Sequence, residues 1–365
     1  MLKFGNTYLN FGGTYLTKVQ PNYNPLNLPP YTIRAKFKTG YTPTMGSTQT
    51  LVDSDENIWD ICDSNNIWYW NKLFQSCHDL LAVLGANASN VANMSLMFDN
   101  CHSLSSVSLF DTSNVTTMAY MFHSTSLTTV PLFDTSKVSD FNSMFWNCSL
   151  LSSVPLFDTS NATNMRWMFN GCTSLKSVPL FETHKVTNMD SVFYDCNSLK
   201  SVPLFNTHNV TTMKGMFGNC PSLSSVPLYD TSNVTSMNDM FARCSSALSI
   251  PLYYTSNVTN MDVMFFESNI TSVPLFDTSN VTSMKQMCFN CTKLTSIPLF
   301  NTSKVTNMFQ TFQGCTNVQS GALALYQQAS TQTTPPSNHG GTFYQCGINT
   351  QTGSAELAQI PGDWK

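Results

Sequence analysis

Apolar and polar positions recur along most of this chain at a nearly fixed spacing. A leucine followed by Phe or Tyr returns every 23 or 24 residues, and an earlier degenerate copy at residues 90–101 brings the number of copies to ten. The aligned leucines are Leu109, Leu132, Leu156, Leu180, Leu204, Leu228, Leu252, Leu275 and Leu299. Self-similarity at such a period predicts a repeat solenoid, in which each unit buries its apolar face only against its neighbours.

Each copy divides into two halves with different spacings. In one copy the apolar residues of the first half stand three or four apart, at Ala162, Met165, Met168, Phe169 and Cys172, which predicts a short helix or 3₁₀ turn. Residues 175–180 then read Leu-Lys-Ser-Val-Pro-Leu. We expect a short strand with its apolar side chains facing inward, kept irregular by a proline that cannot donate a ladder hydrogen bond. About ten such coils make a solenoid of the leucine-rich-repeat type.

The ends of the chain do not follow the repeat. Residues 1–84 begin with Phe-Gly-Asn-Thr-Tyr-Leu, echoed as Phe-Gly-Gly-Thr-Tyr-Leu, which predicts a small hairpin. An alternating strand is expected over 31–38, aromatic bulk comes from Trp59, Trp68 and Trp70, and residues 73–84 have apolar positions on one helical face. We expect a β-rich aromatic N-terminal cap and attachment region (1–84), the solenoid (85–320) and a C-terminal cap (321–365) with helices near 321–329 and 355–360.

Composition narrows the range of partners. Only 10% of residues are charged and the net charge is −4, so the basic patch of a nucleic-acid binder is missing. No run of about 18 apolar residues occurs, so we expect no membrane insertion. Residues 1–16 also lack a signal-peptide pattern.

Several recurring residue types invite a chemical role. The cysteine column, from Cys101 to Cys315, could form a metal or disulfide ladder, but Thr125 and Ser268 interrupt it, and we interpret it as buried thiols. The column of Asp111, Asp134 and Asp158 could bind calcium, but it lacks the glycine spacing of such sites, and turn capping is the better interpretation. His184 and His208 are two ligands at most, too few for a metal. We therefore expect no metal, cofactor or catalytic residue.

Two columns remain as binding candidates. The Phe/Tyr after each repeat leucine, from Phe110 to Phe300, suits either a buried stack or a strip on which glycans stack; burial is favoured. The second candidate is the set of positions in the first half of each copy that differ most between copies. Packing does not determine these side chains, although neutral drift on a surface gives the same variation. From this set we single out Tyr120, Trp146, Arg166, Trp167, Tyr194 and Phe266 as candidate binding residues.

The pattern Met-Phe-x-x-Cys-x-Ser-Leu-x-Ser-Val-Pro-Leu-Phe-Asp-Thr-Ser-Asn-Val-Thr-x-Met resembles the BspA-like leucine-rich repeats of bacterial surface and tailed-phage proteins, over residues 85–320. The resemblance implies a leucine-rich-repeat solenoid used in adhesion or protein binding. Exported members of that family carry signal sequences, which this N-terminus lacks.

The sequence therefore predicts a non-enzymatic binding protein. The leading hypothesis is a phage virion component, associated with the tail or a fibre, that contacts a protein or glycan on the bacterial host surface and docks on other virion proteins through its N-terminal region. A bacterial cell-surface adhesin and a purely architectural virion protein are the alternatives. An enzyme that cleaves carbohydrates would need paired carboxylates across a groove, and the acidic column offers a ladder instead.

Overall fold

The computed structural model describes residues 26–46, 48–63, 69–246 and 249–365, together with the backbone of three short strands near the N-terminus. These strands, β1 (Lys3–Phe4), β2 (Thr7–Leu9) and β3 (Tyr15–Thr17), form an antiparallel sheet. The hairpin expected from the repeated hexapeptide is confirmed by the pairing of β2 with β3, while its expected glycine turn lies outside the described residues.

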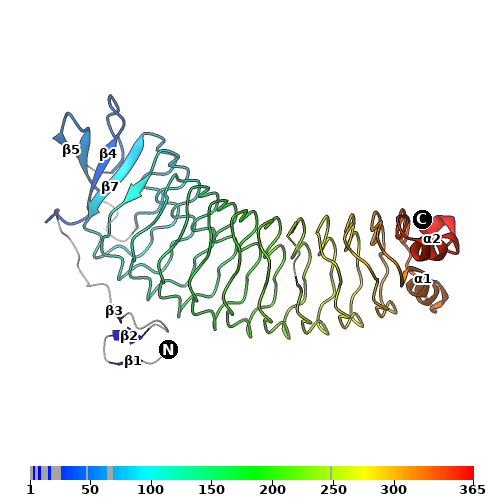
Figure 1. Cartoon of the computed structure of the whole chain (residues 1–365). Helices are drawn as coiled ribbons and strands as arrows, with labels where there is room; N and C mark the ends of the chain where they lie inside the picture. The colour runs from blue at the N-terminus through cyan, green and yellow to red at the C-terminus, as the bar shows by residue number, and fades with distance from the viewer. Residues whose placement is uncertain are drawn as a thin grey trace.

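Coils stacked along one axis make up the main body, which runs from a small sheet to two terminal helices (Figure 1). Single-residue parallel bridges link the same position of successive coils, and the ladder starts at Tyr69 and ends at Asn338. The expected solenoid is confirmed. Its ladder has twelve rungs in the described residues, at Tyr69, Asn93, Thr117, Asp140, Asn164, Asn188, Thr212, Ser236, Asn260, Ser283, Asn307 and Asn338. Coil geometry therefore extends beyond both ends of the expected 85–320 range.

A five-stranded sheet closes the N-terminal end of the solenoid. Its strand order is β5 (Thr48–Asp53), β6 (Ile58–Cys62), β4 (Thr32–Phe37), β7 (Leu80–Ala86) and β8 (Ser106–Val107). All pairs are antiparallel except β7 with β8, which lie parallel as successive coils do. The sheet is thus continuous with the coils, and the expected strand over 31–38 is confirmed as β4.

The aromatic core expected near this sheet is present in part. Trp70 is buried and Trp59 packs half-buried against the core, whereas Trp68 lies outside the described residues. The helix expected over 73–84 is wrong, because the chain forms turns there and then enters β7. The amide of Phe74 donates to the carbonyl oxygen of Met97 in the next coil at 2.9 Å. In an α-helix that amide would donate to the carbonyl oxygen four residues earlier in the same helix.

The half-coil expected as a short helix or 3₁₀ turn is a run of turns instead, with no helix in the described coils. Its amides alternate between two kinds of acceptor. The amide of His123 donates to Tyr120 O, three residues back in the same coil, at 3.2 Å. The amides of Phe122 and Ser124, directly before and after His123, donate to Met144 O and Trp146 O of the next coil at 2.9 and 2.7 Å. This alternation stacks the coils, which an α-helix cannot do.

The alternating bonds require a left-handed backbone at two positions per coil. Tyr120 and Ser124 have φ values of 57° and 54°, and later coils repeat this with Trp167 at 57° and Gly171 at 73°. Only glycine adopts this region without cost, and β-branched residues are the least suited to it. The backbone of the turn half is therefore specified by the ladder and not by the local preference of each residue.

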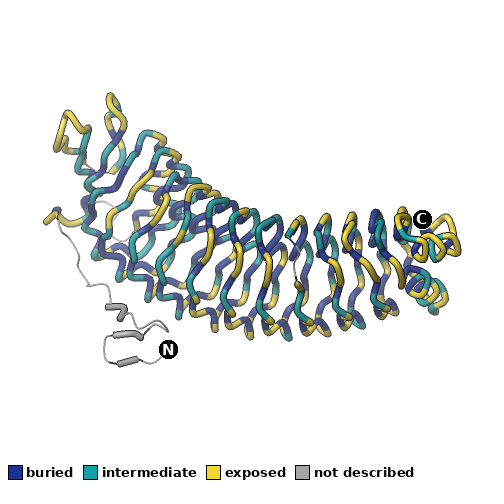
Figure 2. The backbone as a smooth tube through the Cα atoms, in the orientation of Figure 1, coloured by how far each residue is buried: buried dark blue, intermediate teal, exposed yellow. Residues whose placement is uncertain are grey.

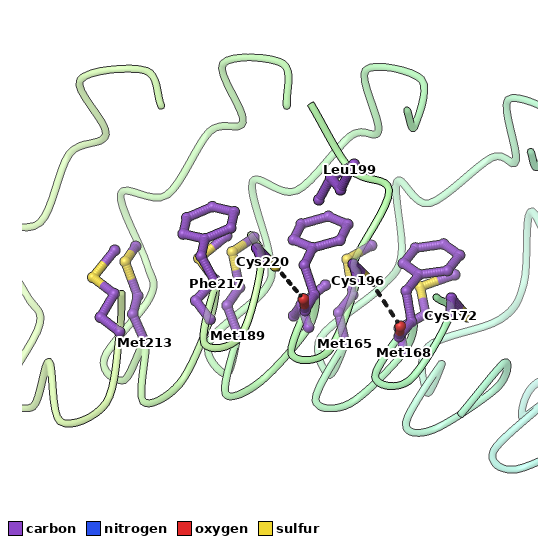
Figure 3. Packing of buried hydrophobic residues seen from close by; sticks show 14 of the residues in the cluster. Met165, Met168, Cys172, Met189, Cys196, Leu199, Met213, Phe217 and Cys220 are labelled. Carbon is purple, nitrogen blue, oxygen red and sulfur yellow. Dashed lines mark hydrogen bonds between the residues drawn. The ribbon is translucent and has the colours of Figure 1, made fainter. Parts of the chain in front are cut away.

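The core consists of columns, one residue per coil. Phe98, Phe122, Phe145 and Phe169 stack with ring centroids 5.6 or 5.7 Å apart, and methionines and cysteines line up beside such rings (Figure 3). The Phe/Tyr after each repeat leucine forms a second buried column, from Phe110 at 0% to Phe205 at 5% exposure. The structure thus confirms that this column is buried and does not form a strip on which glycans stack.

The repeat leucine itself does not face inward as expected. Leu180, Leu204, Leu228, Leu252, Leu275 and Leu299 are 54% to 62% exposed. At Leu204 the backbone forms a γ-turn, in which the amide of Phe205 donates to Pro203 O at 3.1 Å. The same bond encloses the half-buried Leu132 and Leu156, so the turn alone does not set the exposure of the leucine. The ring that follows is buried and the leucine projects outward. Exposed segments recur at matching places in successive coils (Figure 2).

The C-terminal end carries the helices α1 (Ala322–Thr331) and α2 (Gln351–Ala358), followed by a short 3₁₀ helix at Gly362–Trp364. Both expected helices are present, although α2 begins earlier than the sequence indicates. Between them Phe343 stacks on Phe312 at 6.1 Å and adds a final turn rung. Trp364 covers that rung, with its ring 6.3 Å from Phe343. Neither helix is long and apolar enough to span a bilayer.

Candidate binding surface

The candidate residues from the sequence all lie on the outside of the turn half, which we call the turn face. It is formed by the residues that flank the stacked Phe column and point away from the core. One of its positions directly follows the stacked Phe and holds His123, Trp146, Tyr194 and Phe266 in different coils. Phe289 occupies the same position after Cys288, which takes the place of the stacked Phe in its coil. The left-handed position two residues before that Phe holds Tyr120 and Trp167.

Four of the six candidates come together on neighbouring coils. Trp146 lies at the centre, with ring centroids 6.1 Å from Tyr120 and 5.4 Å from Trp167. The Arg166 guanidinium carbon lies 4.0 Å from the centroid of the Trp167 ring, a cation–π distance. We call Tyr120, His123, Trp146, Arg166 and Trp167 the aromatic cluster. Its rings are half-buried against one another and Arg166 is exposed.

His123 belongs to this cluster although the sequence analysis did not select it. Its ring stacks on Trp146 with centroids 4.5 Å apart, and its Nδ1 lies 2.5 Å from Asp99 Oδ1. Asp99 is buried, so the carboxylate fixes the ring beneath the tryptophan. The signal was present in the repeat alignment, because His123 occupies the same position after Phe122 that Trp146 occupies after Phe145.

Tyr194 lies apart from the aromatic cluster and depends on two glycines of the next coil. A Cβ atom on Gly218 would lie 2.5 Å from Tyr194 Cε2, and one on Gly215 would lie 3.3 Å from Cδ2. The tyrosine ring therefore occupies space that any other residue at Gly218 would fill. Burial, followed by the nearby Asp239 carboxylate, raises the pKa of the Tyr194 hydroxyl.

Phe266, the sixth candidate, belongs to a second group of aromatic and charged residues. Its ring stacks on Phe289 with centroids 4.9 Å apart, and the Arg243 guanidinium carbon lies 5.1 Å from its centroid. Arg243 also pairs with Glu267 through Nε at 3.3 Å. Burial raises the pKa of the Asp239 carboxyl to about 6, against the lowering effect of Arg243. The structure thus divides five of the six candidates between two aromatic groups, and Tyr194 lies between these groups along the chain.

An open polar depression crosses the coils beside the aromatic cluster. It has a volume of about 520 Å³, within the roughly 300–1,000 Å³ of ligand sites, although it is open and polar where most of those are apolar. Asn147, directly after Trp146, and Asp195, directly after Tyr194, lie in its lining. The complete lining is Asn147, Ser149, Gly171, Thr173, Asp195, Asn197 and Asn219. Hydrogen-bonding groups therefore stand next to exposed ring edges.

The other recurring residue types serve the coil backbone. The Cys196 thiol donates to Phe169 O at 3.1 Å, and all twelve cysteines of the chain are free. The acidic column caps turns, as expected, since the amide of Ser232 donates to Asp230 Oδ1 at 3.0 Å. This hydrogen bonding lowers the pKa of Asp230. His184 is exposed, and His208 Nδ1 lies 3.2 Å from Asp230 Oδ2. Within the described ranges, no group of three or more His, Cys, Asp or Glu residues is arranged to hold a metal ion.

Comparison with known families gives four overlapping matches to a single profile. It is described as "Mycoplasma protein of unknown function, DUF285", and it matches residues 68–177, 125–226, 163–273 and 223–326. The matches together run from 68 to 326, most of the chain, and they begin next to Tyr69, the first rung of the bridge ladder. No curated protein gives a significant sequence match.

Two solved structures are similar at low identity. A leucine-rich repeat protein from Eubacterium ventriosum is 15% identical, with a TM-score of 0.43, over 88% of this chain and 99% of that one. A leucine-rich cell surface protein from Faecalibacterium prausnitzii is 18% identical, with a TM-score of 0.38. The match spans 72% of this chain and 66% of that protein, slightly under two thirds of its length.

Proposed function

The chain belongs to the DUF285 family, and from this premise we propose that it is a non-enzymatic binding protein whose aromatic cluster contacts the surface of a bacterium. The observation that carries the proposal is the contact of Trp146 with both Tyr120 and Trp167, at 6.1 and 5.4 Å, on positions that coil packing leaves free. Other coils hold Leu, Ser, Gly, Asp, Val or Gln at the left-handed position, so the fold does not require a large ring there.

The composition of the cluster supports a contact with another macromolecule. Trp, Tyr and Arg are the residues that most often dominate binding energy at interfaces. Trp and Tyr bury a large area with little loss of conformational freedom. Here the rings hold one another in place, and Asp99 fixes His123 below them. The neighbouring depression supplies amide, hydroxyl and carboxylate groups that suit the polar groups of a surface protein or glycan.

The setting that we propose first is a virion, with the chain associated with a tail or fibre and docked on other virion proteins through its N-terminal region. The second setting is the bacterial cell itself, where the chain acts as an adhesin. The family description names Mycoplasma, which favours this second setting. Mass spectrometry of purified phage particles and of proteins released by proteolysis from intact bacteria distinguishes the two. Presence in neither fraction contradicts the proposal.

The binding proposal is tested by replacing Trp146 and Trp167 together with Ser. Loss of two central aromatic anchors is expected to weaken attachment to bacterial cells at least tenfold, because such residues each contribute about 2 kcal/mol or more. The matched control is Tyr69→Ser, since Tyr69 is an aromatic residue 55% exposed at the first rung of the ladder, away from the aromatic cluster. Equal attachment by both variants would assign binding to another surface.

A further inference from the structure

The six outward leucines form a continuous apolar line on a face that the turn half does not share. We call Leu180, Leu204, Leu228, Leu252, Leu275 and Leu299 the leucine stripe; each is more than half exposed. The earlier leucines of the same column, Leu109, Leu132 and Leu156, are half-buried and pack against the core. The stripe is therefore confined to six consecutive coils, and coil packing does not explain it.

The residues beside the stripe keep its centre free of charge. A half-buried proline precedes each leucine, and an exposed serine lies two residues before that proline. Charges lie on both sides of the stripe. The exposed Lys176 and Lys200 directly precede the serine in two coils, and the column after the buried ring varies from coil to coil, with Glu182, Asn206, Asp230, Tyr254, Asp277 and Asn301. An uncharged apolar centre with a polar rim is the anatomy of a protein interface.

The backbone holds the stripe rigid. In the coil of Leu228 the amide of Tyr229 donates to Pro227 O at 3.1 Å, and the Tyr229 hydroxyl donates to Pro203 O of the preceding coil at 3.0 Å. Leu275 and Leu299 are enclosed by the same proline-to-phenylalanine hydrogen bond. Because the backbone that carries the leucines is already fixed, covering the stripe costs little backbone freedom, which favours association.

The dimensions of the face suit a modest interface. Six rungs at a spacing of about 4.8 Å extend over about 29 Å, and the five steps from the serine to the flanking column add about 17 Å. The footprint is thus roughly 500 Å², whereas the largest apolar patch on a typical monomer is roughly 300–600 Å² and often functional. Two such faces would together bury roughly 1,000 Å², the lower limit for a specific interface.

The regularity of the stripe identifies its partner. The turn face varies between coils, as a surface does when it meets a partner without a repeat. The leucine stripe holds the same residue in six coils, while the flanking column varies. A partner that meets six equally spaced leucines needs apolar groups with the same spacing, and another copy of this solenoid has them. The coils concerned also follow a nearly straight line in Figure 1, so two stripes can stay in register.

We propose that the leucine stripe is a homodimer interface, at which two copies of the chain pack leucines of one stripe between those of the other. This assembly is independent of what the turn face binds, because the stripe shares no residue with the aromatic cluster. It would present two aromatic clusters on one particle and so raise the avidity of a surface contact.

Sedimentation equilibrium of the full chain tests the proposal. The wild type is expected to be a dimer at micromolar concentration, and Leu228→Asp is expected to weaken association at least tenfold, because each dimer then buries two charges at its centre. The control Leu150→Asp changes a leucine that is 49% exposed but lies outside the stripe, and it should remain dimeric.

Circular dichroism confirms that the variants are folded, and Leu228→Ser replaces Leu228→Asp if the latter is not. A wild type that stays monomeric at 100-fold higher concentration overturns the proposal, including the case in which another part of the same chain covers the stripe. A dimer that Leu228→Asp and Leu150→Asp weaken equally, or not at all, overturns it as well.

Discussion

The Cys196 thiol donates a hydrogen bond to the carbonyl oxygen of Phe169, one coil earlier, at 3.1 Å. The same bond recurs from Cys220 to Phe193 O at 2.9 Å, and Figure 3 shows such thiols beside the stacked rings. Where the column lacks a thiol, Ser268 donates to Phe241 O in its place. The column is thus retained for a buried donor that satisfies a carbonyl oxygen inside the core.

This relationship predicts an order of stability for two variants. Cys196→Ser keeps a donor, as Ser268 does naturally, and should cost less than about 1 kcal/mol of unfolding free energy. Cys196→Ala removes this donor, while Phe169 O keeps the amide of Cys172 as a donor at 3.1 Å. The alanine variant should therefore cost about 0.5–1.5 kcal/mol more than the serine variant. Urea unfolding measures both. An alanine variant as stable as the serine variant would show that the thiol acts only through its volume.

The cysteines should also differ in reactivity towards a thiol reagent. All twelve are described, and Cys62 alone is not buried. Burial raises the pKa of the Cys148 thiol to about 11 and that of Cys244 to about 12, so little thiolate is present near neutral pH. In native protein we expect rapid modification of Cys62 only, and of all twelve thiols after unfolding. Rapid native modification of several thiols would contradict the packed column.

The same shifts predict that the solenoid loses stability in alkali. Unfolded cysteines lose their protons near pH 8.5, whereas the folded thiols of Cys148 and Cys346 have pKa values of about 11 and 12. Above pH 9 the folded state therefore binds more protons than the unfolded state, and stability falls as pH rises. The urea midpoint should be flat from pH 7 to 8 and should decline from about pH 9 through 12. Substituting Cys148 by Ser should reduce the slope.

Substitutions at two left-handed positions are expected to change the stability of the protein in opposite directions. Val263 has φ 52°, a conformation poorly suited to a β-branched residue, whereas Asn tolerates it. Val263→Asn should therefore stabilise the protein by about 0.5–1 kcal/mol. Gly171 has φ 73°, and a Cβ there would lie 2.3 Å from Asn147 Oδ1, so Gly171→Ala should destabilise it by about 1–2 kcal/mol. Thermal melting of both variants measures the effect, and shifts of equal sign would contradict the role of the backbone.

Much of the architecture follows from the sequence because the same pattern recurs in every copy of the repeat. The period, the buried Met, Phe and Cys columns, β4 and α1 are all predicted from spacing alone. The turn half is not, because Met165, Met168 and Cys172 are spaced alike on a helix and on a chain of alternating turns. What decides between them is the neighbouring coil, which accepts every second amide.

The candidate site was predictable in composition but not in grouping. Variation between copies selects Trp146 and Trp167, yet the separation of Tyr194 from them depends on the bare backbone of Gly218. The outward Leu204 was missed for a different reason. A leucine in an apolar pattern predicts burial, whereas in the structure the ring of Phe205 takes the inward position and Leu204 projects into solvent. Which molecule the turn face binds stays a prediction.

The alternating amides of the turn half have a mechanical consequence. Bonds such as Phe169 N to Val192 O, at 3.0 Å, run from coil to coil along the long axis of the molecule. A force pulling the two ends apart loads these rungs one after another, so the solenoid should unravel a coil at a time. Each released coil of 24 residues adds roughly 80 Å of extended chain. Anchored at both ends, such a molecule yields by lengthening in steps before it breaks away.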